Sequence, residues 1–314
     1  MLPGIGRTPE FTASLTGPAV SWFCMNRVLV IGATGNVGRQ VVSQLAAAGA
    51  KVRALARNPD TAALPSHVEV VRGDLTLPES LDACLDGVDA VFLVWLAPPA
   101  AVAPALERIL KQARRIVFLS SPYKTPHPFF QAGQPNPTAS MQAEIERLIE
   151  NSGREWTFLR PGMFASNTVV WWAPLVRSGA KVVRWPYIAA PTAPIHERDI
   201  AAVAVRALCE EGHAGSEYLL TGPQTLTQSE QIAIVGDVIR RPLRLEEISP
   251  DEARTELLST YPAYILNYLL KAWDAAIGRP AFMTSTIEQI TGVPARSFRN
   301  WATDHAADFR SPLA

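Results

Sequence analysis

The sequence predicts an α/β fold, a doubly wound parallel sheet followed by a smaller, mostly helical C-terminal substrate domain. Short apolar runs alternate with helical patterns over residues 27–160. Strands that are apolar throughout and separated by helices form parallel sheets covered on both faces. A glycine-rich turn, Gly32-x-x-Gly35-x-x-Gly38, joins the first apolar run to the first helical pattern. Beyond the sixth strand the alternation loosens, and residues 250–310 read as mostly helical.

The predicted strands of the sheet are apolar runs bounded by turn residues, and they lie at 27–32, 51–57, 68–74, 89–94, 115–120 and 155–161. Helical patterns connect them at 37–49, 78–86, 100–113 and 138–153. Because crossovers between parallel strands are right-handed, this alternation gives a doubly wound sheet of the Rossmann type. In the last of these helices Ala143, Ile145, Leu148 and Ile149 are expected to share one apolar face.

The later chain adds fewer regular elements. Further strands are predicted near 181–185 and 216–220, and helices near 197–211 and 226–239. The Pro/Gly-rich loop 122–137 is too polar and broken for an element, so we expect it to lie over the strand ends. The expected units are then a dinucleotide-binding domain over 26–165, with strands added from later chain, and an interleaved substrate domain over 166–314.

Residues 1–25 are expected to form a disordered leader. The first 24 residues are rich in Pro, Gly, Ser and Thr, and they lack the basic start and apolar centre of a secretory signal. Met25 immediately precedes the first strand, so it can equally be the true initiator. A weak transit peptide is the remaining alternative.

Charge and composition narrow the partners. The chain has 29 basic and 29 acidic residues and no Lys/Arg-rich run, which argues against nucleic acid as a partner. No apolar run reaches the roughly 18–20 residues that span a bilayer. Three scattered cysteines predict neither a disulfide framework nor a zinc site, and they fit a cytoplasmic setting. A small-molecule partner and no metal are expected, and a homodimer is left open.

The glycine-rich turn has the spacing of a dinucleotide-binding loop. Gly32 allows the tight turn, Gly35 lets the backbone approach a pyrophosphate, and Gly38 lets the helix pack on the strand. The helix N-terminus then offers unpaired N–H groups and a partial positive charge to the phosphates. The residues expected to hold the dinucleotide here are Gly32, Thr34, Gly35, Asn36, Val37 and Gly38.

The end of the second strand chooses between NAD(H) and NADP(H). An acidic residue there binds the ribose 2′-hydroxyl, whereas this chain has Arg57 and no acid before Asp60. An arginine fits a 2′-phosphate by charge and by its fork of donors, so NADP(H) is predicted. The alternative for Arg57 is a solvated loop residue. Asp74 and Leu75 are expected near the adenine, and Val94 along the path to the nicotinamide.

Several stretches together resemble a known family. They are "VLVIGATGNVGRQVV", "RGDLTLPESLDACLDGVDAVFLV", "IVFLSS", "AEIERLIENSGREWTFLRPGMFASN", "YLLTGPQTLTQSEQ" and "ITGVPARSFRNWATDHAADF". The chain resembles, over about 26–310, the NmrA-like group of atypical short-chain dehydrogenase/reductases. The resemblance implies an extended Rossmann domain, a smaller substrate domain and NADP(H) as ligand. That group includes quinone and benzylic-ether reductases, and also dinucleotide-binding redox sensors that catalyse nothing.

The chain departs from the family pattern at the two positions that usually hold the catalytic tyrosine and lysine. The superfamily usually carries Tyr-x-x-x-Lys on the helix before the sixth strand, where the lysine lowers the pKa of the tyrosine. The corresponding places hold Thr138 and Gln142. Gln142 can hydrogen-bond a ribose hydroxyl but supplies no charge. Ser121 matches the superfamily's serine position, and Tyr123 is the predicted proton donor, with an ordinary loop tyrosine as the alternative.

The stretch "RPGMFASN" resembles the family's nicotinamide-facing turn, so Pro161 and Phe164 are expected against the ring. Other conspicuous residues have structural interpretations. His127 is expected to be exposed or structural, and His196 to cap a helix. The adjacent Trp171 and Trp172 are expected mainly in the core, and the aromatic stripe of the tail is expected to pack or to cover an apolar substrate.

Three functions are consistent with these residues. The first is an NADPH-dependent oxidoreductase of a small, largely apolar carbonyl, quinone or aromatic substrate. The second is a non-catalytic NADP(H)-binding regulator that senses redox state, which the missing Tyr–Lys pair favours. The third is an isomerase or cyclase that uses the same scaffold.

Overall fold

The computed structural model describes residues 26–131, 137–258 and 261–310, so the predicted leader lies outside the described residues. Its central feature is a seven-stranded sheet in the order β3-β2-β1-β4-β5-β6-β9, in which every neighbouring pair is parallel. The strands are β1 Arg27–Ile31, β2 Lys51–Ala56, β3 Glu69–Arg72, β4 Ala90–Val94, β5 Arg115–Leu119, β6 Glu155–Pro161 and β9 Ser216–Leu220. The predicted doubly wound parallel sheet is confirmed.

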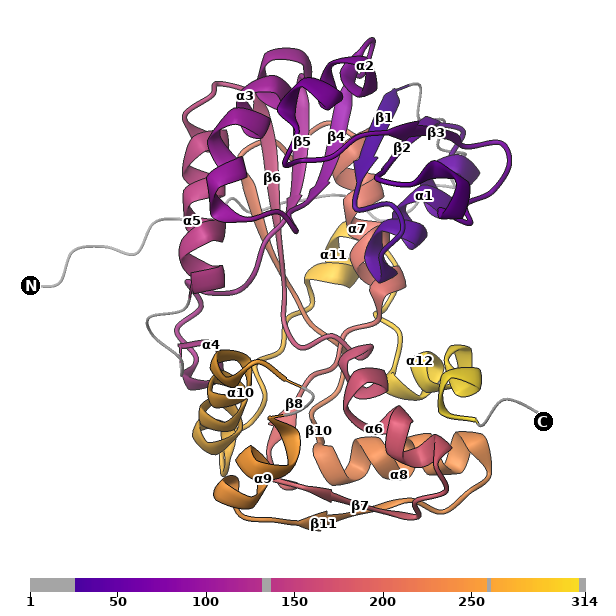
Figure 1. Cartoon of the computed structure of the whole chain (residues 1–314), viewed down its shortest axis with the longest axis vertical. Coiled ribbons are helices and arrows are strands. Elements are labelled where there is room, and N and C mark those ends of the chain that lie inside the picture. Colours follow the sequence, from indigo (N-terminus) through magenta and orange to yellow (C-terminus); the bar gives the residue numbers. More distant parts are fainter. Residues whose placement is uncertain (1–25, 132–136, 259–260, 311–314) are drawn as a thin grey trace, which may run out of the picture.

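Helices cover both faces of the sheet, as its apolar strands require (Figure 1). On one face α1 packs on α7, and α11 packs on α7 and β9; on the other, α3 packs on α5 and α2. The bounds of these helices are α1 Asn36–Ala47, α2 Asp82–Leu85, α3 Val102–Gln112, α5 Pro137–Glu150, α7 Glu197–Cys209 and α11 Thr286–Thr291. Residues beyond 195 thus supply the edge strand β9 and the helices α7 and α11, which cover one face of the sheet.

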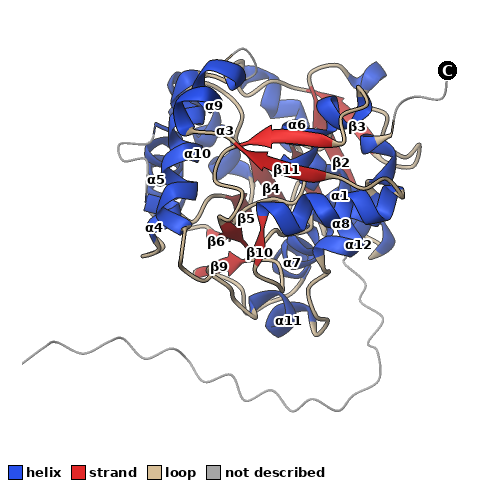
Figure 2. Cartoon of the chain, turned by 90° about the horizontal axis from the view of Figure 1, so that it is seen from below, coloured by secondary structure: helices blue, strands red, loops and turns tan. Residues whose placement is uncertain are grey.

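The remaining elements gather beyond the carboxyl ends of the parallel strands (Figure 1). They are α4 Pro128–Gln131, α6 Asn167–Arg177, β7 Val182–Trp185, β8 Pro191–Thr192, β10 Leu226–Thr227, α8 Gln228–Ile239, β11 Arg244–Glu247, α9 Pro250–Leu257, α10 Ala263–Ala276 and α12 Phe298–Asp304. Viewed from below, α9 and α10 lie on one side of β11 and α8 and α12 on the other (Figure 2). The C-terminal part is therefore mostly helical, as predicted.

The core of this C-terminal part is built on four buried tryptophans, Trp171, Trp172, Trp185 and Trp273. Their ring centroids are 5.4–6.2 Å apart, with several edge-to-face pairs. Such pairs add to the apolar area that each indole buries. The predicted core role of Trp171 and Trp172 is confirmed.

Two segments differ from the sequence prediction. The helix expected at 78–86 divides into a 3₁₀ turn over Pro78–Leu81 and the short helix α2, and the expected loop 122–137 contains α4. Leu81 and Phe129 are buried in these segments, so local apolar anchors decide their conformation. In the part of the chain that the structure describes, no helix is both long and apolar enough to span a bilayer.

Candidate functional site

The glycine loop has the backbone that its sequence predicts. Gly32 has φ +85°, a conformation that side chains disfavour. A Cβ on Gly38 would lie 2.0 Å from the carbonyl oxygen of Gly32, so only glycine lets α1 approach the loop this closely. Gly35 caps the start of α1 without any side-chain hydrogen bond. The N-terminal N–H groups of α1 therefore meet no capping side chain and stay available to an anion.

A cavity of about 280 Å³ adjoins this loop at the carboxyl ends of β1, β2 and β4. The predicted cofactor residues that line it are Gly32, Thr34, Arg57, Asp74, Leu75 and Val94. The remaining loop residues lie beside it. Gly35 and Asn36 are exposed, while the Val37 side chain packs into the sheet core, so only its backbone can face a ligand.

Two side chains set the charge of this cavity. Arg57 is exposed at the end of β2, and its guanidinium forms no hydrogen bond or ion pair within the described residues. Asp74 accepts hydrogen bonds from the backbone N–H of Thr76 at 2.9 Å and from its hydroxyl at 2.8 Å. These bonds, chiefly the backbone one, hold the pKa of Asp74 below its usual range. The cavity therefore offers one unpaired cation beside a carboxylate that its own loop already engages.

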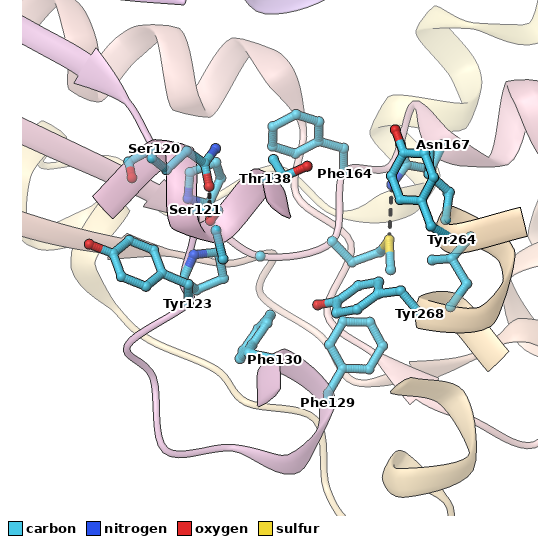
Figure 3. Close-up of a pocket in the computed structure, with 18 residues that line it drawn as sticks. Ser120, Ser121, Tyr123, Phe129, Phe130, Thr138, Phe164, Asn167, Tyr264 and Tyr268 are labelled. Carbon is cyan, nitrogen blue, oxygen red and sulfur yellow. Dashed lines mark hydrogen bonds between the residues drawn. The ribbon is translucent and has the colours of Figure 1, made fainter. Parts of the chain in front are cut away.

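A second, larger cavity of about 400 Å³ opens at the carboxyl ends of β5 and β6 (Figure 3). Its walls come from the loop after β5, from α4 and α5, from the turn after β6, and from α6 and α10. Phenylalanine and tyrosine rings make up much of the surface. None of the described residues that line this cavity is Asp, Glu, Lys, Arg or His.

The second cavity gathers every remaining predicted site residue: Ser121, Tyr123, Gln142, Pro161 and Phe164. Thr138 lines it as well, so both places of the missing Tyr-x-x-x-Lys pair face this cavity. The Ser121 hydroxyl donates a hydrogen bond to the side-chain carbonyl of Gln142. With its oxygen engaged in this way, Gln142 keeps its amide N–H groups as donors.

Tyr123 lines the cavity with its ring, while its hydroxyl points away from it (Figure 3). The hydroxyl donates to Oε2 of Glu146 at 2.6 Å. Burial, together with this hydrogen bond, raises the pKa of Tyr123 far above its ordinary value. The geometry favours a structural position for this phenol, and its role as proton donor stays a prediction.

Behind Tyr123 lies a buried ionic cluster that sequence reasoning missed. Glu146, on α5, is 1% exposed and receives a two-pronged contact from Arg160 of β6, at 3.0 Å and 2.6 Å. Arg160 also contacts Glu217 of β9 at 2.5 Å and 2.7 Å, and Lys124 lies 3.3 Å from Glu146. Ser120 donates to Glu146 at 2.6 Å. These contacts join four neighbouring segments next to the cavity, which Ser120 and Tyr123 themselves line.

Burial alone raises the pKa of Glu146, but the hydrogen bonds from Arg160, Ser120 and Tyr123 outweigh it, so the net pKa is lowered. The carboxylate is charged and compensated. No local pattern in the sequence joins residues from α5, β6 and β9. The one available signal was Arg160, a charge that directly follows the apolar pair Phe158 and Leu159 inside a strand.

The C-terminal region contributes Tyr264, Ile265, Tyr268 and Leu269, all from α10. Two tyrosines of the aromatic stripe, Tyr264 and Tyr268, thus line the second cavity, and a role as a cover over an apolar substrate stays a prediction. His127 lies outside the cavity, between Phe130 and Phe282, with ring centroids 5.8 Å and 6.1 Å away. Among the described residues, no group of three or more His, Cys, Asp or Glu residues is arranged to hold a metal ion.

Comparison with known proteins places this geometry in context. The profile of a family described as NAD(P)H-binding matches residues 32–211. The (4-alkanoyl-5-oxo-2,5-dihydrofuran-3-yl)methyl phosphate reductase of Streptomyces griseus subsp. griseus is 42% identical over 292 residues, covering 90% of this chain and 99% of that protein. The NAD(P)H azoreductase of Xenophilus azovorans is 32% identical over 292 residues, with the same coverage of both chains.

A solved structure shares the fold. The Citrobacter sp. triphenylmethane reductase complexed with NADP(H) superimposes with a TM-score of 0.73 at 20% identity, covering 89% of this chain and 99% of that chain. The solved structure shows the same fold, and the family match and the two reductase relatives confirm the resemblance to NmrA-like atypical short-chain dehydrogenase/reductases.

Proposed function

Because this chain belongs to the NAD(P)H-binding family and is an NAD(P)H-dependent oxidoreductase, we propose that it uses NADPH to reduce a small, uncharged, conjugated acceptor. The observation that carries the proposal is the aromatic-lined cavity at the ends of β5 and β6, where the described lining residues are all uncharged. It lies beside the turn expected to face the nicotinamide.

The residues of the first cavity fit a nicotinamide dinucleotide. Gly32 and Gly38 shape a loop that a Cβ would fill, and the uncapped start of α1 suits a pyrophosphate. Arg57 is the side chain that would hold a 2′-phosphate, since it is exposed and unpaired within the described residues. An acidic residue at this place would repel such a phosphate. These features support NADPH over NADH.

The two relatives suggest what the acceptors share. The furanone in the first name has a ring double bond conjugated to a lactone carbonyl and to an alkanoyl carbonyl, and an azo compound has a conjugated N=N bond. In both, negative charge that develops on reduction is spread over several atoms. Such acceptors require less from a protein than an isolated ketone does. This chemistry agrees with a site in which Thr138 and Gln142 replace the usual Tyr and Lys.

The bound cofactor would supply a hydride, and the protein's own residues orient the acceptor and exclude water. The rings of Phe129, Phe130 and Phe164 offer flat apolar surfaces for a planar acceptor. Gln142 presents amide N–H donors, since its oxygen is engaged by Ser121. A donor held in a dry cavity stabilises developing negative charge more strongly than one in water.

No basic side chain is among the described residues that line the second cavity, and this narrows the choice of substrate. A phosphate ester such as the one named for the first relative would bring a dianion to a cavity without a basic lining residue. Lys124 and Arg160 lie nearby, but both are paired with Glu146 and Glu217. Burying an unpaired charge costs several kcal/mol. The substrate proposed for this chain is accordingly the uncharged form of a conjugated acceptor.

Single-turnover kinetics tests the proposal. The protein loaded with one equivalent of NADPH is mixed with 1,4-naphthoquinone or an uncharged 3-acyl-furan-2(5H)-one, and the loss of dihydronicotinamide absorbance is followed. Oxidation well above the rate without protein is expected for at least one acceptor. Tight NADPH binding with no oxidation by any acceptor would contradict the proposal.

A further inference from the structure

One half-buried phenol of the second cavity lacks a hydrogen-bond partner among the described residues. Tyr268, on α10, is half-buried, and its hydroxyl points toward the middle of the cavity (Figure 3). Within the described residues this hydroxyl makes no hydrogen bond. The Tyr268 hydroxyl is thus not among the fully buried polar atoms and opens into the cavity, where it is free to donate a hydrogen bond to a bound ligand.

The other hydroxyl groups of the cavity are engaged or peripheral. Tyr123 donates to Glu146 and faces away, and Ser121 donates to Gln142. Thr138 has a partner of its own. Tyr264 is 61% exposed, which places it at the mouth of the cavity. Tyr268 is therefore the phenol best placed to meet a ligand inside.

Resting on the function proposed above, we propose that the Tyr268 hydroxyl donates the hydrogen bond, and then the proton, to the oxygen of the bound acceptor. As a hydride adds to the conjugated carbon, the π electrons of the double bond move onto the carbonyl oxygen, which becomes an enolate. The O–H bond of Tyr268 breaks, a new O–H bond forms on the enolate oxygen, and the phenolate regains its proton from water. Hydride from NADPH and this proton together complete the two-electron reduction.

The chemistry of the phenol agrees with this role. Burial raises the pKa of Tyr268 above its ordinary value, so the group is fully protonated at neutral pH and remains a donor. A donor in this position would stabilise charge without the lysine that the superfamily normally uses. The donor would then come from the C-terminal helical region instead of from α5.

The test compares Tyr268→Phe with a matched control, Tyr261→Phe. Both changes remove one phenol oxygen, but the Tyr261 hydroxyl is buried outside the cavity and has no partner within the described residues. Binding is measured by calorimetry with dihydrocoumarin, an uncharged lactone without a conjugated ring double bond, and with chroman, which has the same rings without the carbonyl. Tyr268→Phe is expected to weaken dihydrocoumarin binding about tenfold and leave chroman and NADPH binding unchanged.

Kinetics provides the second measurement. With an acceptor that the wild type reduces, Tyr268→Phe should slow the single-turnover step about 100-fold, while Tyr261→Phe leaves it unchanged. Unaltered dihydrocoumarin affinity and an unaltered rate in Tyr268→Phe would overturn the inference, as would a large loss in Tyr123→Phe alone. If no acceptor is reduced by the wild type, the proposed function fails, and the dihydrocoumarin and chroman comparison still decides whether Tyr268 binds a carbonyl.

Discussion

Arg57 is the residue proposed to distinguish NADPH from NADH. It is exposed at the end of β2 and forms no side-chain pair within the described residues, so it can give its donors to a 2′-phosphate. We expect Arg57→Ala to weaken NADPH binding about tenfold, since a hydrogen bond to a charged group contributes roughly 1.5–3 kcal/mol and solvent reduces this contribution. Fluorescence titration with NADPH and NADH measures it.

The matched control is Lys51→Ala, because Lys51 is an exposed cation at the opposite end of the same strand. It should leave both affinities unchanged, and Arg57→Ala should leave NADH binding unchanged. A wild-type protein that binds NADH more tightly than NADPH would refute the assignment of Arg57.

Residues whose role depends only on their neighbours in the sequence could be predicted. Gly32 and Gly38 have roles set by a local turn, and Arg57 and Asp74 follow directly from strand ends. Residues that act through distant partners could not. Glu146, Arg160 and Glu217 have meaning only once α5, β6 and β9 lie side by side, and Tyr268 becomes informative only when α10 covers the cavity.

Helix α5 provides a direct comparison between a buried and an exposed ion pair. Glu146 is 1% exposed and compensates Arg160, which is 4% exposed, whereas Glu144 pairs with Arg147 on the outer surface. Removing one partner of a buried pair leaves the other charge uncompensated. We expect Glu146→Ala to lower the free energy of unfolding by about 3 kcal/mol, the low end of the usual range because Arg160 keeps Glu217.

Urea denaturation measures this difference, with Glu144→Ala as the control on the same helix. Glu144→Ala should cause no measurable change, because exposed pairs contribute little. If both substitutions lower the free energy of unfolding equally, the buried cluster contributes no more to stability than an exposed ion pair does.

A second link joins the start of α7 to the end of α12. Glu197, the first residue of α7, lies 2.6 Å from Nε2 of His305, and Asp308 lies 2.8 Å from Nδ1 of the same ring. The ring also stacks on Trp301, with centroids 4.7 Å apart. His196 caps α7 by accepting from the N–H of Arg198, which confirms its predicted role. The link therefore attaches the C-terminal segment to the sheet's covering helix.

This link should make stability depend on pH. Burial alone lowers the pKa of His305, but the hydrogen bonds that its ring donates to the Glu197 and Asp308 carboxylates outweigh it and raise the net pKa above the ordinary 6.5. A raised pKa stabilises the fold fully below pH 6.5, and this contribution is lost as pH rises through the folded-state value. Glu197, whose pKa is well below its usual range, loses its contribution only in acid, below about pH 4.5.

Thermal unfolding between pH 6 and pH 9 tests this expectation. The midpoint of the wild type should fall as pH rises, by about 2–4 °C, which is the shift that about 1 kcal/mol causes in a domain of roughly this size. His305→Gln keeps a hydrogen-bonding group but does not titrate, so its midpoint should be lower at pH 6 and nearly flat. A wild-type midpoint that rises over this range would contradict the link.

At the scale of the whole molecule, the alternation of strands and helices was enough to predict the parallel sheet and its glycine loop. The edge strand β9 and the layer formed by α7 and α11 were harder to assign, because they come from chain beyond residue 195 and return to the sheet. The charge and shape of the second cavity could not be predicted from the sequence for the same reason. Its walls come from six separate segments, so its charge and shape exist only in the assembled molecule.

That assembled cavity leads to the last prediction, which concerns charge selection. The two segments outside the described residues that flank α4, α5, α9 and α10 read "AGQPN" and "ST", so they add no charged side chain. An anionic acceptor therefore meets no compensating cation in this cavity. We expect kcat/KM for 1,4-naphthoquinone to exceed that for 1,4-naphthoquinone-2-sulfonate by at least about 100-fold, since burying an unpaired charge costs several kcal/mol.

Comparing 1,4-naphthoquinone with its 2-sulfonate is a strict test, because the sulfonate group withdraws electrons and makes the ring a better hydride acceptor. Slower reduction of the more reactive compound then reflects poorer binding in the site and not lower reactivity, and the next variant separates charge from size. The converse variant, Asn167→Lys, places a cation at a residue that lines the cavity and should narrow the ratio at least about tenfold. If the wild type reduces the sulfonate as readily as the parent quinone, the cavity does not select by charge, and phosphorylated acceptors return as candidates.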